Sequence, residues 1–289
     1  YINRFHMKLY MCFTKVSKKF NSPISLLASK NSKADQLFSE EEKIDEIIFL
    51  DRKKDKSGTH DGIRGFFNLA NKLKEKNFDR VFIFNSSLRY FLLAKVAGIK
   101  TISQYPLFRT KDNIVNSAKI FTENEINSVV LSEPNLEIKN SKNSFNKEFK
   151  HICLGISASG PTKRWGVENY ISLCEELMKT TKCQFYIAGG KNDLNLINIL
   201  KKSKVGKNCI SFEDLSIKET LPIIKNCDLY IGNDTGWAHI SCSLGVKSLT
   251  LFMDSPVMAY GKYSTRMKVI EPEGEYNSTT HDTLGKSKI

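Results

Sequence analysis

Two loops of this chain combine hydroxyl, glycine and basic residues in a way that suits a phosphate group. The first, Asn233-Asp234-Thr235-Gly236-Trp237-Ala238-His239, separates two apolar runs. If a strand precedes this stretch and a helix follows it, the loop forms the helix N-terminus, where exposed N–H groups and the helix dipole attract anions. Gly236 lets the backbone approach a phosphate closely, Thr235 offers a hydroxyl donor, and His239 falls in the first helical turn.

Asp234 is the member of this motif that does not suit an anion, because its negative charge repels a phosphate. We therefore expect Asp234 to organise the turn as an N-cap that accepts hydrogen bonds from helix N–H groups. Taken alone, the motif is best explained as ordinary helix capping. His239 alone is likewise more typical of a hydrogen-bonded, partly buried histidine than of a ligand. A second loop of the same type favours the binding interpretation.

The second loop is Ser157-Ala158-Ser159-Gly160-Pro161-Thr162-Lys163-Arg164-Trp165-Gly166, which follows a β-rich run. Two serines, the glycine at 160 and two adjacent bases at the end of a strand suit a diphosphate. Considered alone, Lys163 and Arg164 fit a solvated basic loop equally well, and we expect Trp165 to pack against the loop. Together the two loops predict one diphosphate site.

A third loop, Gly189-Gly190-Lys191-Asn192-Asp193, again follows a strand candidate. Asp193 is suited either to accept from ribose hydroxyls or to cap the next helix. No G-x-G-x-x-G or G-x-x-x-x-G-K-[ST] motif occurs, which argues against a dehydrogenase and a P-loop NTPase. No pair of His or Cys residues has the spacing of a metal site, so we expect neither a metal nor another cofactor.

Alternating strands and helices position these loops in the second half of the chain. Helices are expected at Val167 to Lys179, at Leu194 to Lys202, and after the capping box Ser216-Ile217-Lys218-Glu219 as far as Lys225. The βαβ pattern predicts a parallel sheet wrapped by helices. The expected strands are His151 to Ile156, Cys183 to Ala188, Cys209 to Phe212, Asp228 to Gly232, Ser248 to Phe252 and Met267 to Ile270.

The first half repeats this pattern more weakly. The expected elements are strands at Ile24 to Ala28, Ile47 to Leu50, Val81 to Phe84, Lys100 to Ser103 and Ser128 to Leu131, and helices near Gly62 to Lys76 and Ser87 to Val96. The polar segment 132–150 is expected to connect an N-terminal domain, 1–131, to a C-terminal domain, 151–289. The predicted fold class is α/β, with two doubly wound, Rossmann-like domains facing a cleft, and such folds bind ligands at the carboxyl ends of their strands.

Composition limits the class of protein further. The chain has 289 residues, of which 40% are hydrophobic and 26% charged, and charge interrupts every apolar run well before the ~20 residues of a membrane span. Its seven cysteines form no C-x-x-C pair, which is typical of reduced, buried thiols in a cytoplasmic protein.

The net charge of +13 indicates an anionic partner. Residues 1 to 34 carry seven of the Lys and Arg residues and no Asp or Glu. One hypothesis is that this segment contacts anionic lipid at the cytoplasmic face of the inner membrane. The alternative is a solvated basic helix. Nucleic acid is not an expected partner, because the bases are dispersed and no aromatic-basic motif of an RNA or DNA module occurs.

Together, the three loops resemble glycosyltransferase family 9, the ADP-heptose:lipopolysaccharide heptosyltransferases. The features shared with the family are Ser159 to Trp165, Gly189-Gly190, Asn233 to His239, Gly245, Leu249-Thr250-Leu251-Phe252 and Tyr260-Gly261-Lys262. The match is strong over roughly His151 to Ile270. Before His151 the resemblance is limited to the general pattern of the sequence. In that part, Phe84-Asn85-Ser86-Ser87-Leu88-Arg89 looks like the family's strand-to-helix element that faces the acceptor.

The resemblance implies a GT-B architecture in which the C-terminal domain holds the donor nucleotide and the N-terminal domain the acceptor. It assigns Lys163, Thr235, Gly236 and His239 to the donor diphosphate, Ser159, Asp193 and Leu215 to the nucleotide, and Ser86, Ser87 and Arg89 to the acceptor side. Trp237 stands where the family usually has a smaller or aliphatic residue, which leaves the anion site intact and changes the local packing.

The resemblance also has one clear departure. The family places its catalytic base, an Asp, in a glycine-containing loop between its first strand and first helix. Residues 1 to 34 contain neither Gly nor an acid, so we assign no base. If Lys8 to Phe20 corresponds to the family's first helix, that strand and loop are expected upstream of Tyr1.

The leading functional hypothesis is an inverting glycosyltransferase that moves a heptose or related sugar from an ADP-sugar to an anionic, lipid-linked saccharide such as the lipopolysaccharide core. One alternative is a catalytically incomplete, nucleotide-sugar-binding remnant. A second is another GT-B-like enzyme, such as a sugar-nucleotide epimerase.

Overall fold

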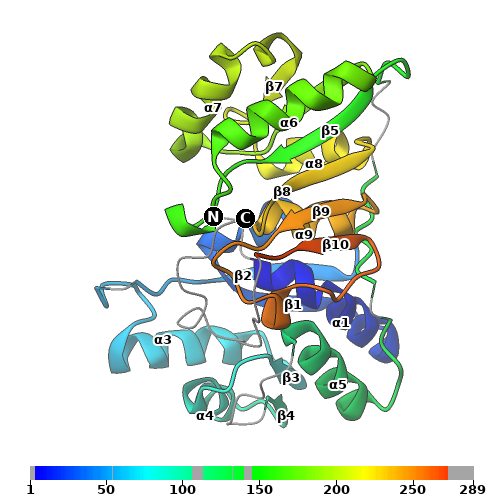
Figure 1. Cartoon of the computed structure of the whole chain (residues 1–289). Coiled ribbons are helices and arrows are strands. Elements are labelled where there is room, and N and C mark those ends of the chain that lie inside the picture. Colours follow the sequence, from blue (N-terminus) through cyan, green and yellow to red (C-terminus); the bar gives the residue numbers. More distant parts are fainter. Residues whose placement is uncertain (1–3, 54, 106–112, 132, 140–144, 273–289) are drawn as a thin grey trace.

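The computed structural model describes residues 4–53, 55–105, 113–131, 133–139 and 145–272, which fold into an N-terminal and a C-terminal α/β unit (Figure 1). Parts of the expected connection, residues 132 and 140–144, and the end of the expected C-terminal domain, 273–289, lie outside the described residues.

The C-terminal unit contains one six-stranded parallel sheet in the order β10-β9-β8-β5-β6-β7. Its strands are β5 (Lys150–Gly155), β6 (Cys183–Ile187), β7 (Cys209–Ser211), β8 (Leu229–Asn233), β9 (Ser248–Leu251) and β10 (Met267–Ile270). Its helices are α6 (Val167–Thr180), α7 (Leu194–Lys202), α8 (Ile217–Lys225), α9 (Gly236–Ser243) and α10 (Val257–Tyr260). Every strand expected here is present, with its bounds shifted by at most one residue at either end, and the capping box at Ser216 and Glu219 is confirmed.

The order of these strands has a direct consequence for the site. The chain runs outward from β5 through β6 to β7, and then returns to the centre as β8 before it continues to β9 and β10. The connections after β5 and β8 therefore leave the sheet in opposite directions from neighbouring strands. Parallel α/β sheets bind ligands at such a reversal, outside the carboxyl ends of the two strands.

The N-terminal unit contains two separate pairs of parallel strands, β1–β2 and β3–β4. The strands are β1 (Ile24–Ser29), β2 (Ile44–Leu50), β3 (Arg80–Ile83) and β4 (Thr101–Gln104), and the helices are α1 (Arg4–Phe20), α2 (Ala34–Leu37), α3 (Gly62–Glu75), α4 (Leu88–Val96) and α5 (Ile114–Ile126). Among the described residues these pairs do not join into one sheet, which differs from the single doubly wound sheet expected for this half.

One expected strand of this unit, Ser128 to Leu131, is wrong. Helix α5 ends with Asn127 in the left-handed conformation, and the chain continues without regular structure. The N–H of Val130 donates to a carboxylate oxygen of Glu123 at 2.8 Å, so its backbone is satisfied locally instead of by a neighbouring strand.

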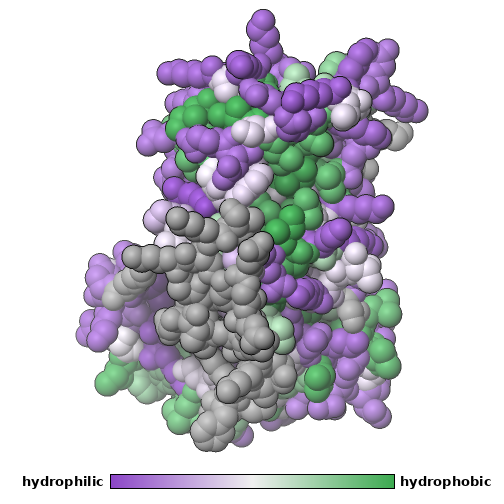
Figure 2. Space-filling model, viewed as in Figure 1, coloured by the Kyte–Doolittle hydropathy of each residue, from purple (hydrophilic) through white to green (hydrophobic). Residues whose placement is uncertain are grey.

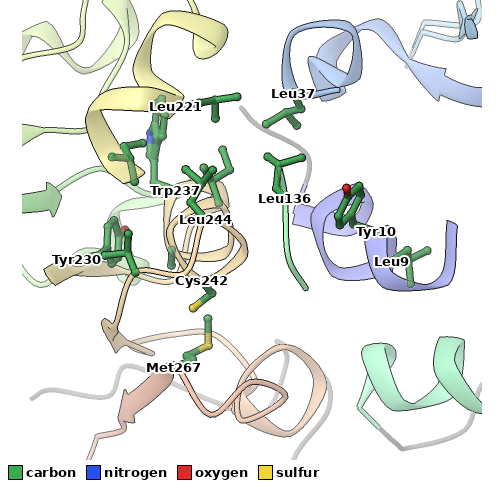
Figure 3. Close-up of a cluster of buried hydrophobic side chains, with 14 of the residues drawn as sticks. Leu9, Tyr10, Leu37, Leu136, Leu221, Tyr230, Trp237, Cys242, Leu244 and Met267 are labelled. Carbon is green, nitrogen blue, oxygen red and sulfur yellow. The ribbon is translucent and has the colours of Figure 1, made fainter. Parts of the chain in front are cut away.

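The two units share one hydrophobic core centred on α1 and α9. Figure 3 shows two groups in this cluster, with Leu9, Tyr10, Leu37 and Leu136 on one side and Leu221, Trp237 and Leu244 on the other. Helix α1 packs against both α5 and α9. The described side chains of α1 are exposed only from Lys18 to Phe20, so the apolar face of this helix belongs to the shared core while Lys18 and Lys19 reach solvent. The N-terminal unit therefore packs against α9, the helix that begins within the Asn233 to His239 motif.

Two expectations from composition are met by the described residues. All seven cysteines are free thiols, six of them buried and Cys209 partly buried. In the described part of the chain, no helix is both long enough and apolar enough to cross a membrane.

Candidate functional site: the loops after β5 and β8

A network of hydrogen bonds from Asn233, the last residue of β8, joins the two phosphate-type loops. Its side chain is fully buried. The N–H of Trp165 donates to Oδ1 at 3.0 Å, and Nδ2 donates to the carbonyl oxygens of Ile156 at 3.0 Å and Ser157 at 3.3 Å. One amide thus fixes both ends of the loop after β5 against the end of β8.

Two glycines and a tyrosine form the floor beneath these loops. Gly155 of β5 and Gly232 of β8 lie side by side in the parallel register, and a Cβ atom on Gly155 would collide with the hydroxyl of Tyr230. That hydroxyl donates to the carbonyl of Asn233 at 3.2 Å and lies 3.4 Å from the hydroxyl of Thr235. Burial raises the pKa of Tyr230 well above its ordinary value, so the group stays protonated and acts as a donor.

The first turn of α9 presents the N–H groups expected of an anion site. Thr235 occupies the N-cap position, and its side chain makes no capping hydrogen bond. Gly236 and Trp237 are the first helical residues. The N–H groups of such a helix N-terminus are suited to an external anionic acceptor.

The predicted N-cap role of Asp234 is wrong, because Thr235 holds that position. The N–H of Asp234 instead donates to the carbonyl of Leu251 at 3.0 Å, which ties the turn to the neighbouring strand β9. Its carboxylate Oδ1 lies 3.2 Å from Nε2 of His239. Asp234 is 4% exposed, so its charge is compensated inside the protein instead of at the surface. Asp234 therefore connects the turn to β9 and to His239.

His239 is also placed differently from the expectation that it lies at the anion. It is 0% exposed, and its Nδ1 lies 2.7 Å from the hydroxyl of Tyr263. The arrangement that satisfies all three groups has Nε2–H donating to Asp234 and the Tyr263 hydroxyl donating to Nδ1. Burial raises the pKa of Tyr263 well above its ordinary value, in keeping with a hydroxyl donor. In this structure His239 is enclosed in the interior, with both ring nitrogens within hydrogen-bond distance of protein groups beneath the turn.

The loop after β5 carries the basic residues of the site. Lys163 is half-buried and ends a short 3₁₀ turn, Pro161–Lys163. Within the same turn, the hydroxyl of Thr162 donates to Oδ2 of Asp254 at 2.8 Å. Asp254 follows β9, so this bond connects the loop to a third carboxyl end of the sheet. Arg164 is held more weakly, with Nη2 at 3.5 Å from the carbonyl of Ala158.

The predicted nucleotide residues lie on neighbouring loops. Ser159 is exposed in the loop after β5, and Leu215 is 37% exposed after β7, in the turn before α8. Asp193 lies after β6 and accepts from the N–H of Gly190 at 3.1 Å. It also sits at the N-cap position of α7 without a capping hydrogen bond, so the alternative capping role is not seen. These three residues therefore share the carboxyl edge of β5, β6 and β7.

The predicted acceptor-side residues lie in the N-terminal unit, after β3. The side chain of Gln104 donates to the carbonyls of Asn85 and Ser87, both at 2.9 Å, and so fixes the loop that contains Ser86. Arg89 donates to the carbonyl of His60 at 3.0 Å and stacks over the Phe66 ring at 5.2 Å. Arg89 is thereby engaged with the start of α3.

Sequence reasoning gave no role to Asn233, Asp254 or Tyr263. A polar residue directly after the apolar run of β8 was the available signal for Asn233. Asp254 has the same signal, because it follows β9. Tyr263 lies 24 residues after His239 and had no local signal at all. In the described ranges, no group of three or more His, Cys, Asp or Glu side chains is arranged to hold a metal ion.

Comparisons with solved structures show that the chain has a GT-B fold. The chain resembles E. coli ADP-heptose LPS heptosyltransferase II, with a TM-score of 0.74 and 18% identity over 97% of this chain and 91% of that one. It resembles a family 9 glycosyltransferase from Veillonella parvula DSM 2008 with a TM-score of 0.74 and 20% identity, over 94% of this chain and 84% of that one. For E. coli heptosyltransferase WaaC with ADP, the TM-score is 0.73 and the identity 10%, over 97% of this chain and 93% of that one.

The sequence comparison defines the family. The model of glycosyltransferase family 9 (heptosyltransferase) matches residues 122–286, which is more than half of the chain. This protein therefore belongs to glycosyltransferase family 9. A search of curated proteins found no match. The resemblance that the three loops suggested is confirmed, as are the GT-B fold class and the assignment as a glycosyltransferase.

Proposed function

We propose that the protein is an inverting glycosyltransferase that transfers a heptose or related sugar from an ADP-sugar to the lipopolysaccharide core or a similar envelope saccharide. The observation that carries this proposal is the network of Asn233, which holds the Lys163 loop against the N-terminus of α9 at the reversal point of the sheet. Two anion-binding elements are thus held together where α/β sheets bind nucleotides.

The chemistry follows from the charges of these elements. Glycosyl transfer passes through an oxocarbenium-like state while negative charge grows on the departing diphosphate. Fixed donors at that position stabilise the transition state more than the ground state. We assign this role to Lys163 and to the backbone N–H groups at Thr235 and Gly236. Asp234 and His239 support the turn, and the proposal includes no metal or other cofactor.

The remaining donor contacts are assigned by position. Ser159 lies beside the nucleotide, Asp193 binds the ribose through the carboxylate oxygen that does not accept from Gly190, and Leu215 covers the adenine. Ser86 and Ser87 belong to the acceptor side. Arg89 acts there as a positioning residue, since its guanidinium is bonded to the start of α3. No residue of the described chain is assigned as the catalytic base.

The proposed acceptor is an anionic, lipid-linked saccharide, and the protein is proposed to work in the cytoplasm with peripheral contact to the inner membrane. Support comes from α3 and α4, whose exposed apolar side chains lie among bases. Figure 2 shows apolar side chains between hydrophilic ones at the lower left of the molecule, where Figure 1 places these two helices. The residues concerned are Ile63, Phe67, Leu88, Leu92 and Val96, with Arg64, Lys72 and Lys95 also exposed. Nucleic acid is not a proposed partner.

The membrane contact is testable with the folded protein and lipid vesicles. Changing Leu88 and Leu92 together to Ser should reduce sedimentation with anionic liposomes, because both side chains are exposed and contribute apolar contact area. The matched control replaces Ile199 and Ile210, exposed side chains of the C-terminal unit, by Ser. Equal sedimentation of both variants and the unmodified protein would remove α4 from the proposed contact.

ADP release with and without acceptor separates this function from its alternatives. Release only in the presence of acceptor supports transfer. Binding of the ADP-sugar without any release supports a catalytically incomplete remnant, and isomerisation of the sugar nucleotide supports an epimerase. The acceptor series should begin with lipopolysaccharide core intermediates, because the family match concerns heptosyltransferases.

A further inference from the structure

The turn that carries Leu215 is held from both units of the protein. The N–H of Leu215 donates to the carbonyl of Phe212 at 3.0 Å, which closes the turn after β7. Phe212 is 1% exposed, and its ring lies 6.1 Å from that of Trp237 in the shared core. The turn then leads into α8, whose first residue is Ile217. A side chain of the N-terminal unit contacts the chain at that residue.

Gln36 of α2 makes this contact. Its side-chain Oε1 accepts a hydrogen bond from the N–H of Ile217 at 2.9 Å. The first N–H groups of a helix have no carbonyl partner within the helix, so they need acceptors from elsewhere. The capping box provides acceptors for the N–H groups of Ser216 and Glu219. Gln36 provides one for Ile217 and so completes the start of α8 from the other unit.

Helix α2 is a firm support for the Gln36 side chain. Leu37 ends this helix and Phe38 follows it, and both side chains are buried. The Phe38 ring stacks on Tyr10 of α1 with the ring centroids 5.6 Å apart. Leu37 belongs to the same buried cluster as Leu221 of α8 (Figure 3), and the two helices pack against each other. The core therefore fixes the position of Gln36 relative to α8.

The neighbouring ionic contact between the same two segments is weaker. Lys218, the second residue of α8, lies 3.8 Å from a carboxylate oxygen of Glu40, and its side chain is 53% exposed. Exposed ion pairs of this kind contribute little and are screened by salt. The bond of Gln36 is half-buried and joins two neutral groups. It is therefore the contact that sets the position of the helix start.

We infer that Gln36 is a positioning residue for recognition of the nucleotide base. It fixes the start of α8 and thereby the preceding turn, which presents the exposed side chain of Leu215. The inference rests on the proposed function, in which Leu215 covers the adenine. It adds that the affinity of the donor site for the base depends on a residue of the N-terminal unit, which acts through Leu215.

This dependence is reciprocal, because two binding events that are coupled through one contact strengthen each other equally. Bound adenine restrains Leu215 and the start of α8, so it also stabilises the contact between α8 and α2. Helix α2 lies in the connection that leaves the carboxyl end of β1. An occupied base site on the C-terminal unit thus steadies one loop of the N-terminal unit.

Calorimetry on the 289-residue chain with two probes, ADP and inorganic pyrophosphate, tests the inference. Gln36→Leu removes the acceptor and should raise the dissociation constant for ADP roughly three- to tenfold, the range expected for one hydrogen bond. The affinity for pyrophosphate should stay unchanged, because this probe carries no base. Gln36→Glu keeps an acceptor at the same distance along the side chain and should retain the affinity for ADP.

The matched control is Gln184→Leu in β6. The side chain of Gln184 is also half-buried, and its Nε2 donates to the carbonyl of Asn208 at 2.7 Å. Losing this bond should lower the free energy of unfolding about as much as Gln36→Leu does, without changing the affinity for ADP. Lys163→Ala, in contrast, should weaken the binding of both probes.

Unchanged ADP affinity in a folded Gln36→Leu variant would overturn the inference and leave the proposed function intact. Equal weakening of ADP and pyrophosphate in that variant would also overturn it, because the effect would then be a general loosening of the site. An unmodified protein that binds neither probe would refute the proposed function and this inference with it.

Hydrogen exchange in the unmodified protein provides a test that does not depend on the folding of a variant. ADP should slow exchange of the Ile217 amide, because bound adenine stabilises the bond to Gln36. Pyrophosphate at saturation should leave this amide unchanged. Equal slowing by the two probes, or slowing by neither, would overturn the inference.

Discussion

The two units differ most at the centres of their sheets. In the C-terminal unit, β5 is buried at every residue but its first, and its neighbour β8 is buried at every residue but its first. In the N-terminal unit, β3 is buried only at Ile83, although helices lie over it. The central strands of the C-terminal sheet are thus enclosed, whereas those of the N-terminal unit are partly exposed. Complete packing of the C-terminal sheet holds the loops after β5 and β8 in fixed positions.

The largest effect on stability is expected at Asn233, whose side chain holds the loop after β5 against the end of β8. Asn233→Ala removes the partner of the Trp165 N–H and of two carbonyls in a fully buried place, so we expect a loss of roughly 2–4 kcal/mol in the free energy of unfolding. Chemical denaturation measures this loss. Asn169→Ala, which removes one exposed amide from the carbonyl of Trp165, should cost much less. Equal losses in the two variants would mean that Asn233 does not organise the site.

Adding volume to each sheet sharpens the comparison. Gly155→Ala places a methyl group against the Tyr230 hydroxyl, and overpacking of this kind should cost about 1–3 kcal/mol in unfolding free energy. Ser25→Val adds volume to β1, which lines a cavity of about 910 Å³ together with β3, and should change stability by no more than ~0.5 kcal/mol. Thermal and denaturant unfolding test both variants. A Ser25→Val variant as damaged as Gly155→Ala would show that the N-terminal sheet is closed as well.

A smaller effect is expected at Tyr263, which contacts His239 beneath the turn at Asp234 and Thr235. Tyr263→Phe leaves Nδ1 of His239 without its donor and should cost ~1 kcal/mol in unfolding free energy. Because the turn at Asp234 and Thr235 depends on His239, affinity for ADP should fall along with stability. Calorimetry with ADP measures the second quantity. The control is Tyr186→Phe, which removes the hydroxyl 3.1 Å from Nδ1 of His151, a buried tyrosine–histidine pair away from the loops after β5 and β8. An ADP affinity reduced only by the control would contradict this coupling.

The smallest effect is expected on stability at low pH, through a carboxyl group of the N-terminal unit. The Lys53 N–H and the Arg52 guanidinium hold the pKa of Asp61, at the start of α3, below its ordinary value of 3.8. A depressed pKa stabilises the folded state above the ordinary pKa, and this contribution is lost as pH falls from 3.8 through the lower folded value. Asp61→Asn should therefore flatten the acid limb of the stability curve. A curve of unchanged shape, followed by circular dichroism, would contradict this assignment.

The strands of the C-terminal sheet were easier to predict from the sequence than those of the N-terminal unit. Strands such as β5 and β8 are near-continuous apolar runs, which is the sequence pattern expected of a strand that is buried on both faces. The glycine and hydroxyl residues after them mark turns by their own chemistry. For these reasons the sequence predicted the positions of Lys163, Thr235 and Gly236 relative to strands and helices correctly.

What the sequence could not predict depends on distant partners. Asp234 is an ordinary capping residue by type, and only the fold brings its carboxylate to His239 and its N–H to Leu251. Tyr263 reaches His239 from beyond β9. The expected strand at Ser128 to Leu131 has suitable residues but no neighbour to pair with. The division of the N-terminal sheet could not be read from its strands, because each of them looks like a normal strand.

The central claim, that the loops after β5 and β8 form one diphosphate site, is tested most directly by calorimetry with ADP on Lys163→Ala. Loss of a charge-assisted contact of ~1.5–3 kcal/mol predicts a dissociation constant raised roughly 10- to 150-fold. The control is Lys179→Ala, which removes an exposed lysine paired with Glu176 at the end of α6 and should leave the affinity unchanged. An unchanged affinity for ADP in Lys163→Ala, in a protein that remains folded, would contradict the claim.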